Sequence, residues 1–221
     1  MSFILHIDTA GQTASIAISA NDTLLVEKLN TNQFDHASWI HTAIQEAMLE
    51  VNLSLEKVDA ISVTIGPGSY TGLRVGLSTA KGLCYALEKP LITIPTLQLM
   101  ASVVECNTNT WICPMIDARR MEVYYAIYDQ ALNEIQPAQA LILNTESFLA
   151  ELETHKIIFC GNGMEKFKPL CSSANASYSS DSATAAAMIP IALGKLLKKE
   201  FADLAYCTPL YVKEFYSGSK S

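Results

Sequence analysis

The sequence is poor in charge, and the charge it has is mostly acidic. Only 17% of its 221 residues are charged, and 15 Lys and Arg face 22 Asp and Glu, which gives a formal net charge of −7. Proteins that hold nucleic acid by bulk electrostatics need a basic surface, so this balance argues against that class. A hydrophobic content of 50% excludes disordered and fibrous chains and suits one domain or two modest lobes.

Long apolar runs and paired cysteines are missing as well. Arg74 and Lys81 interrupt the longest apolar candidate, so no stretch reaches the roughly 20 residues of a membrane helix. The start of the chain lacks the basic and apolar regions of a signal peptide. The six cysteines include no C-x-x-C pair. We therefore expect them to act as small buried hydrophobic residues, and we expect the protein to be located in the reducing cytoplasm.

Hydrophobic periodicity predicts two similar halves, each with the element order βββαβαβα. The first half is predicted to hold strands at 3–8, 14–19 and 23–27, a helix at 35–51 capped by Asp35, a strand at 58–65, a helix at 71–87, a strand at 91–94 and a helix from Thr96. The second is predicted to hold strands at 111–116, 122–128 and 138–143, a helix at 146–153, a strand at 157–160, a helical turn at 164–170 and a helix at 183–201 that Pro190 should kink or interrupt. We therefore expect an α/β fold of two lobes, residues 1–106 and 107–221.

The most distinctive segment is glycine-rich and runs from Gly66 to Gly76, between a predicted strand and a predicted helix. Backbone N–H groups at such a place attract phosphate. However, the segment lacks the Gly-Lys-Ser/Thr ending of a P-loop, and its glycines at 66, 68 and 72 miss the G-x-G-x-x-G spacing by one residue. A nucleotide loop is therefore the less favoured interpretation.

Small residues also form a stripe along the helix that follows. Gly72, Gly76 and Ala80 are four residues apart, with Thr79 beside them. An interior glycine costs about 1 kcal/mol relative to alanine, and close approach of another backbone usually offsets that cost. The stripe packs either onto the protein's own sheet, which the residues alone slightly favour, or against a helix of a partner, with helix 35–51 as the neighbouring half of that surface.

Two hairpins invite comparison with phosphate-binding loops. Asp8-Thr9-Ala10-Gly11 resembles the first phosphate loop of sugar kinases and actin-like ATPases, although an ordinary Asx turn is at least as common. At the equivalent place in the second half, Asp117-Ala118-Arg119-Arg120 has arginines instead of glycines, and Gly161-Asn162-Gly163 is weak evidence for an adenosine-side turn. We therefore expect no bound cofactor and no ATP hydrolysis by this chain alone.

Arginine and histidine give little sign of a catalytic or metal centre. The only arginines are Arg74, Arg119 and Arg120, and Glu122 is a natural partner for one of them, so salt bridges between the lobes are favoured over an anion site. His36 and His41 are five residues apart, about 140° around a helix, and cannot chelate one ion. There is no G-x-S-x-G nucleophile elbow.

Four segments of the sequence resemble the TsaB (YeaZ) family. They are Ile4 to Thr9, Gly66 to Gly76, Met115 to Tyr124 and Pro209 to Lys213. The resemblance implies an actin-like ATPase (ASKHA) fold and a non-catalytic paralogue of TsaD. TsaD-type subunits transfer threonylcarbamoyl to the adenosine next to the anticodon of ANN-decoding tRNAs, with a TsaE-like ATPase in the larger complex.

The resemblance also implies where partners bind. A TsaD-like subunit would dock on the first-lobe helices, so docking becomes favoured over internal packing for the small-residue stripe. The expected interface residues are Trp39, Ala43, Gly72, Leu73, Gly76, Thr79, Ala80 and Leu83. Family-motif residues without an assigned role are Arg74, Asp117, Arg119, Arg120 and Glu122. The chain would meet tRNA through the complex, need no membrane, and form a homodimer when alone; the alternative is a stand-alone ATPase, small-molecule kinase or peptidase.

Overall fold

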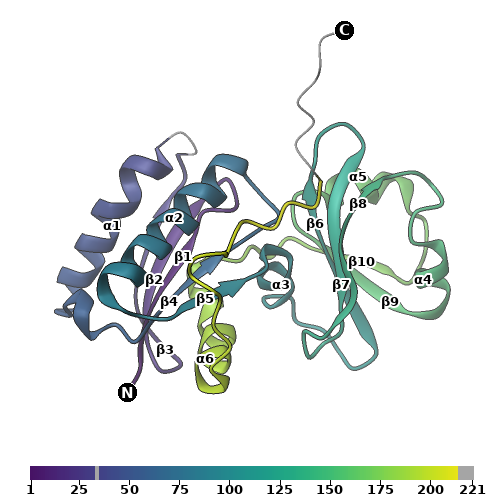
Figure 1. Cartoon of the computed structure of the whole chain (residues 1–221). Helices are drawn as coiled ribbons and strands as arrows, with labels where there is room; N and C mark the ends of the chain where they lie inside the picture. Colours follow the sequence, from purple (N-terminus) through teal and green to yellow (C-terminus); the bar gives the residue numbers. More distant parts are fainter. Residues whose placement is uncertain (33–34, 214–221) are drawn as a thin grey trace, which may run out of the picture.

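The computed structural model describes residues 1–32 and 35–213. Two lobes lie side by side, each built on a five-stranded mixed sheet (Figure 1). The first half of the chain forms β1 (Phe3–Asp8), β2 (Ala14–Ala20), β3 (Thr23–Asn30), α1 (His36–Glu50), β4 (Ala60–Thr64), α2 (Tyr70–Leu87), β5 (Leu91–Ile94) and α3 (Thr96–Ala101). The second forms β6 (Thr110–Asp117), β7 (Glu122–Tyr128), β8 (Glu134–Ile142), α4 (Leu149–Thr154), β9 (Lys156–Cys160), α5 (Met164–Phe167), β10 (Ala176–Ser179) and α6 (Ile189–Lys198).

The two sheets share one topology. The first has the strand order β3-β2-β1-β4-β5, and the second has the order β8-β7-β6-β9-β10. In each, the first three strands are antiparallel neighbours, and the fourth and fifth add in parallel after helical crossovers. The predicted duplication and the actin-like α/β fold are confirmed.

Three local predictions need correction. Strand β10 was not predicted, because Ala-Ser-Tyr-Ser carries little β-branched or aromatic signal. Asp35 lies at the N-cap of α1 but makes no capping bond with its side chain, which instead accepts a hydrogen bond from the Asn32 amide. The predicted helix at 183–201 is interrupted and not kinked: a 3-10 helix spans Ala185–Met188, and α6 begins at Ile189 with Pro190 in its first turn, where its missing N–H has no intrahelical partner to lose.

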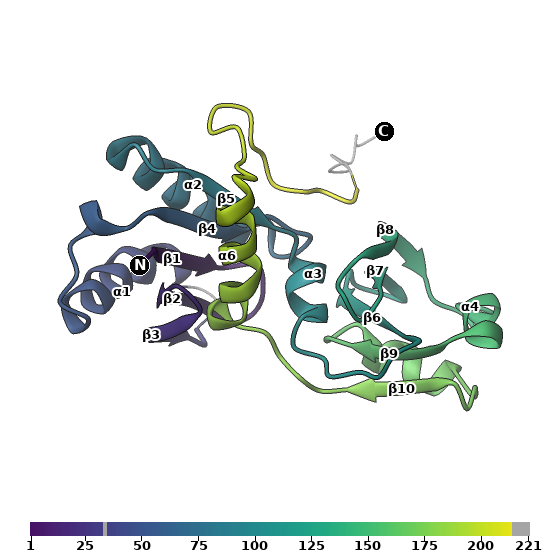
Figure 2. The same ribbon diagram turned by 90° about the horizontal axis from the view of Figure 1, so that it is seen from below.

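The last helix of each half covers the sheet of the other half. In α3, Leu97 and Ala101 pack with Ile112 on the second sheet. Met188, just before α6, and Ala192 within it pack with Ile4 and Ile92 on the first sheet. Figure 2 shows α6 lying across the first sheet and α3 between the lobes. We call this arrangement the helix exchange.

The helix exchange corrects the predicted division of the chain. A boundary near residue 106 matches the passage from α3 into β6, but residues 183–213 return to the first lobe. The reason is that α1 and α2 cover only one face of the first sheet, and the apolar side chains of the other face are buried by the returning segment. Residues 214–221 of the predicted second lobe lie outside the described residues.

The C-terminal segment, Ala202 to Lys213, runs along α2 toward the second lobe (Figure 1). The Lys81 ammonium donates hydrogen bonds to the carbonyls of Ala205, at 3.3 Å, and Cys207, at 3.0 Å. The Leu210 N–H donates to the Ile65 carbonyl at 2.7 Å. Lys213 then pairs with Glu122 on β7, so this segment connects the two lobes.

A polar triad lies inside the first sheet. The His6 ring is fully buried, with Nδ1 2.7 Å from the Ser62 hydroxyl and Nε2 2.9 Å from the Ser19 hydroxyl. Burial lowers the pKa of His6 to about 3, so the ring is neutral at physiological pH. The triad satisfies both ring nitrogens without a charge and therefore has a structural role.

The six cysteines are free; Cys84, Cys113 and Cys160 are buried, and burial raises the pKa of Cys84 and of Cys160 to about 12. Buried thiols with raised pKa values are unreactive, so the prediction of small buried hydrophobes holds for these three, whereas Cys106, Cys171 and Cys207 are partly exposed. Over residues 1–32 and 35–213, no helix has the combined length and apolar character that a membrane span requires.

Candidate functional site

The hairpin between β1 and β2 is closed around the carboxyl group of Asp8. This side chain is 7% exposed and accepts hydrogen bonds from the Thr64 hydroxyl at 2.7 Å and the Ala10 N–H at 3.0 Å. Burial raises the pKa of Asp8, and the two hydrogen bonds and the nearby His36 oppose that shift. The Asx-turn interpretation of this segment therefore describes its local geometry.

Substitutions at Asp8 should separate its charge from its hydrogen bonds. Asp8→Asn keeps an acceptor oxygen and removes a buried charge, so we expect a free energy of unfolding at pH 7 at least equal to that of the wild type. Asp8→Ala leaves the Thr64 hydroxyl and the Ala10 N–H without their acceptor, and should lower that free energy by about 1 to 3 kcal/mol. Urea unfolding at pH 7 measures both. Equal stability of the two variants would show that the hydrogen bonds matter little.

The glycine-rich loop packs directly onto this hairpin. The Ser69 N–H donates to the Ala10 carbonyl at 2.8 Å, and the Thr9 hydroxyl donates to the Gly72 carbonyl at 2.7 Å. A Cβ on Gly68 would lie 2.5 Å from the Ala10 carbonyl oxygen, and one on Gly72 would lie 2.0 Å from the Thr9 carbonyl oxygen. Glycine is required at these positions because two stretches of backbone meet there without room for a side chain.

The small-residue stripe on α2 therefore faces the interior of its own lobe. A Cβ on Gly76 would lie 2.3 Å from the Thr9 hydroxyl oxygen. Of the eight expected interface residues, six are buried in this chain: Ala43, Gly72, Leu73, Gly76, Thr79 and Ala80. Internal packing accounts for the burial of these six residues, and their role in a docking face stays a prediction; Trp39 and Leu83 are partly exposed.

A groove on the outer side of the two helices was missed by the sequence analysis. The α1–α2 groove has a volume of about 340 Å³ and is lined by apolar side chains that include Ile44, Met48, Leu49, Leu53 and Leu83. Leu49 is 72% exposed although it is large and apolar. The available signal was the position of Leu49, which lies off the helical stripe formed by the buried residues of α1.

Within residues 1–32 and 35–213, none of the three arginines forms the predicted salt bridge. Arg74 donates from Nε to the Tyr211 hydroxyl at 3.0 Å, which raises its pKa, and its guanidinium lies 4.0 Å from the centre of the Tyr70 ring. Glu122 pairs with Lys213 instead of an arginine. The lobes are thus joined by a lysine of the C-terminal segment, a residue whose place the local sequence pattern does not reveal.

The hairpin between β6 and β7 carries the other two arginines. The Asp117 carboxylate accepts a hydrogen bond from the Arg119 N–H at 2.6 Å and pairs with Lys166, which lowers the pKa of Asp117. The Asn162 side chain accepts from the Asp117 N–H at 2.9 Å, so the Gly161–Gly163 turn is bound to the end of β6. The structure brings these two motif segments together at one end of the second sheet.

Histidine offers no metal site in the described part of the chain. His36 is buried and neither ring nitrogen has a hydrogen-bond partner, whereas His41 is exposed. Across residues 1–32 and 35–213, no three His, Cys, Asp or Glu side chains gather closely enough to hold an ion.

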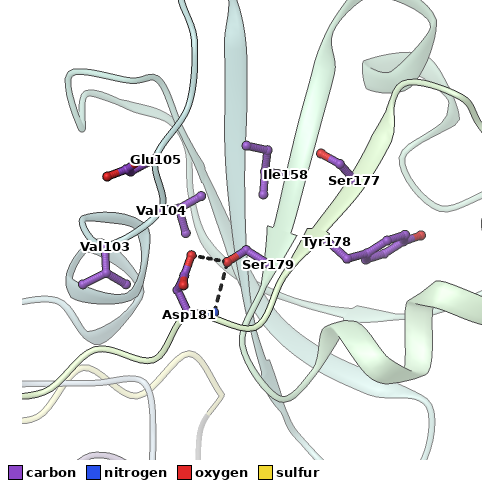
Figure 3. Close-up of a pocket in the computed structure, with 8 residues that line it drawn as sticks. All are labelled: Val103, Val104, Glu105, Ile158, Ser177, Tyr178, Ser179 and Asp181. Atoms are coloured by element: carbon purple, nitrogen blue, oxygen red, sulfur yellow. Dashed lines mark hydrogen bonds between the residues drawn. The ribbon is translucent and has the colours of Figure 1, made fainter.

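A second hollow lies between residues 103–105, which follow α3, and the edge of the second sheet at β9 and β10 (Figure 3). It has a volume of about 400 Å³, and Glu105 and Asp181 supply its charged side chains. The Ser179 hydroxyl donates to Asp181 Oδ2 at 2.5 Å and accepts from the Asp181 N–H at 3.0 Å. This hydroxyl is thus occupied within the loop, and the residues that line the hollow include no His, Lys or Arg.

Two duplicated sheets of this topology define the class: a protein of actin-like ATPase fold whose first phosphate-type hairpin is filled by its own helix α2. The family model described as TsaD, tRNA N6-adenosine threonylcarbamoyltransferase, matches residues 30–214. The chain belongs to this family and, within it, to the TsaB (YeaZ) group.

Individual relatives agree with this assignment. The Bacillus subtilis tRNA threonylcarbamoyladenosine biosynthesis protein TsaB is 28% identical over 170 residues, which cover 76% of this chain and 74% of that protein. The Escherichia coli protein of the same name is 35% identical over 133 residues, but only 60% of this chain and 57% of that protein align. A Pseudomonas aeruginosa structure, described as similar to peptidase YEAZ, has a TM-score of 0.85 at 21% identity, covers 96% of this chain and 100% of its own, and supports the fold.

Proposed function

We propose that this chain is a non-catalytic, partner-binding subunit in tRNA threonylcarbamoyladenosine biosynthesis in the cytoplasm. Its partner would be a TsaD-type transferase, with a TsaE-like ATPase in the larger assembly. Family membership supports the process, since relatives across the family carry the TsaB name. The coverage of some relatives is partial, so the role of the whole protein is part of the proposal.

The proposal of a non-catalytic role rests on the β1–β2 hairpin, which packs directly against the glycine-rich loop and α2. A phosphate bound at such a place needs free backbone N–H groups. Here the Ala10 N–H is bound to Asp8, the Ser69 N–H to the Ala10 carbonyl, and the Gly72 N–H to the Ser69 hydroxyl at 3.2 Å. Because these donors already have partners inside the lobe, this hairpin is poorly suited to hold the phosphates of ATP.

The α1–α2 groove supports the partner-binding part. It exposes Leu49 at the surface and has Leu83 in its wall, and large exposed apolar side chains beside a groove are typical of protein interfaces. The groove lies on the helices that the family resemblance assigns to the TsaD-type subunit. The proposed interface therefore keeps those helices but uses their outer faces instead of the buried stripe.

A matched pair of substitutions tests this interface. Leu49→Asp should weaken binding to the cognate TsaD-type protein at least tenfold, because it places a charge in an apolar interface. Leu197→Asp is the control, since Leu197 on α6 is 75% exposed and Leu49 is 72% exposed. Both variants should unfold at the wild-type temperature. Isothermal titration calorimetry measures the affinity, and threonylcarbamoyl transfer to tRNA by the mixed proteins measures the activity.

Two results would contradict the proposal. One is the absence of any complex between the wild-type chain and the TsaD-type protein. The other is ATP or peptide hydrolysis by the purified chain alone, which would return attention to a stand-alone enzyme. Unchanged binding by Leu49→Asp would place the interface elsewhere, and equal loss in both variants would show that the effect is not specific to the groove.

A further inference from the structure

The tip of the β6–β7 hairpin holds two adjacent arginines in an unusual backbone conformation. Arg119 has φ 72° and Arg120 has φ 48°, both in the left-handed region. Glycine and asparagine adopt this region readily, whereas other residues are uncommon there because of their Cβ. The local backbone therefore does not explain why arginine occupies both positions, and the side chains need another explanation.

The charges around this tip leave the two arginines uncompensated. The two acids that flank the turn are already paired, Asp117 with Lys166 and Glu122 with Lys213. Both arginines are exposed, and among the described residues neither guanidinium group has a hydrogen-bond or ion-pair partner. These six side chains together carry a net charge of +2 on a protein whose formal net charge is −7.

Arg74 shows how this chain uses an arginine for structure. Its guanidinium is bound by the Tyr211 hydroxyl and lies over the Tyr70 ring. Arg119 and Arg120 have no comparable support and project from a turn of four residues, 118–121, between two paired strands. They are placed to bind something outside this chain.

We propose that Arg119 and Arg120 bind phosphate groups of the tRNA backbone. This inference rests on the proposed function, which supplies the RNA. Guanidinium groups match phosphate oxygens with two parallel hydrogen bonds and stay charged at any physiological pH. Successive phosphates of one strand present a row of anions to two neighbouring arginines, and the otherwise acidic protein limits the contact to this tip.

Fluorescence anisotropy with a labelled transcript of an ANN-decoding tRNA tests the contact, using the chain mixed with its TsaD-type partner. The R119Q/R120Q variant should bind about tenfold more weakly. The slope of log Kd against log salt concentration should be smaller than the wild-type slope by about one to two. The reason is that a complex without these two phosphate contacts releases fewer counterions on binding. The control is K57Q/K198Q, which removes the same charge from exposed lysines of the first lobe and α6 and should bind within twofold of the wild type.

A glycine variant separates binding from folding. Glycine adopts positive φ without strain, so R119G/R120G should melt at or above the wild-type temperature and still lose the same tRNA affinity. A structural role for the arginines would give the opposite result, with a lower melting temperature and unchanged affinity.

The first measurement is whether the wild-type chain forms a complex with the TsaD-type protein. Absence of that complex contradicts the proposed function. A complex that binds tRNA with the same affinity and salt dependence with or without the arginines contradicts only the phosphate contact. If the arginine variants bind tRNA normally but no longer bind the TsaD-type protein, the guanidinium groups bind protein carboxylates. That result would also overturn the inference.

Discussion

Replacing Gly72 by alanine is expected to destabilise the first lobe severely. The added Cβ would lie 2.0 Å from the Thr9 carbonyl oxygen and 3.2 Å from the Ser69 side chain. Thr9 is fully buried, and its hydroxyl is bound to the Gly72 carbonyl, so the backbone on both sides is fixed. Overpacking of this kind costs about 1 to 3 kcal/mol, and contact with rigid backbone places Gly72→Ala at the upper end or beyond.

Gly82→Ala is the matched control, because it lies in the same helix and its added Cβ would meet nothing within 4 Å. Alanine is the better helix former, so this variant should gain roughly 0.5 to 1 kcal/mol. In urea unfolding, the free energy of unfolding should therefore fall below the wild-type value for Gly72→Ala and rise above it for Gly82→Ala. If Gly72→Ala unfolds like the wild type and fails only to bind its partner, the stripe is a docking face after all.

Acid should destabilise the protein through His6. The folded pKa is about 3, below the ordinary value of 6.5, so between these values the unfolded chain binds the proton and the folded one does not. This contribution is fully present above pH 6.5 and is lost as pH falls toward 3. Each pKa unit between the two states corresponds to about 1.4 kcal/mol, so we expect a loss of several kcal/mol at the acid limit.

His6→Gln isolates this effect, since the amide cannot take up the proton. Its free energy of unfolding should be lower than that of the wild type at pH 7.5 but fall less steeply between pH 6.5 and 4.5. Asp8 acts in the opposite direction: its folded pKa is raised by burial, so the folded state binds its proton more readily and gains stability as pH falls. Parallel curves for the wild type and His6→Gln in urea titrations would show that His6 does not titrate on unfolding.

Local patterns were enough to predict the repeated element order. Apolar runs separated by turn residues marked most strands, and the periodicity of Ile40, Ala43, Ile44 and Ala47 marked α1. The helix exchange could not be predicted from the sequence. An amphipathic pattern shows which face of α6 is apolar but does not indicate which sheet that face covers. The lobe boundary was therefore drawn from chain order, and the return of residues 183–213 was missed.

In the candidate site too, local sequence patterns could not identify which residues make contact. Spacing identified Gly72 and Gly76 as positions of close approach, but two partners were possible, and only the position of Thr9 decides between them. Glu122 was expected to bind an arginine and binds Lys213 instead, from 91 residues away in the sequence. Long-range pairings of this kind depend on the complete fold and leave no local pattern.

The helix exchange also has a consequence for synthesis on the ribosome. Ile4 is synthesised well before Met188 and Ala192, which bury it. Until then the first sheet exposes an apolar face, and α3 waits for a second sheet that does not yet exist. Neither lobe can complete its core early, so the nascent protein spends most of its translation time open to aggregation and to capture by chaperones.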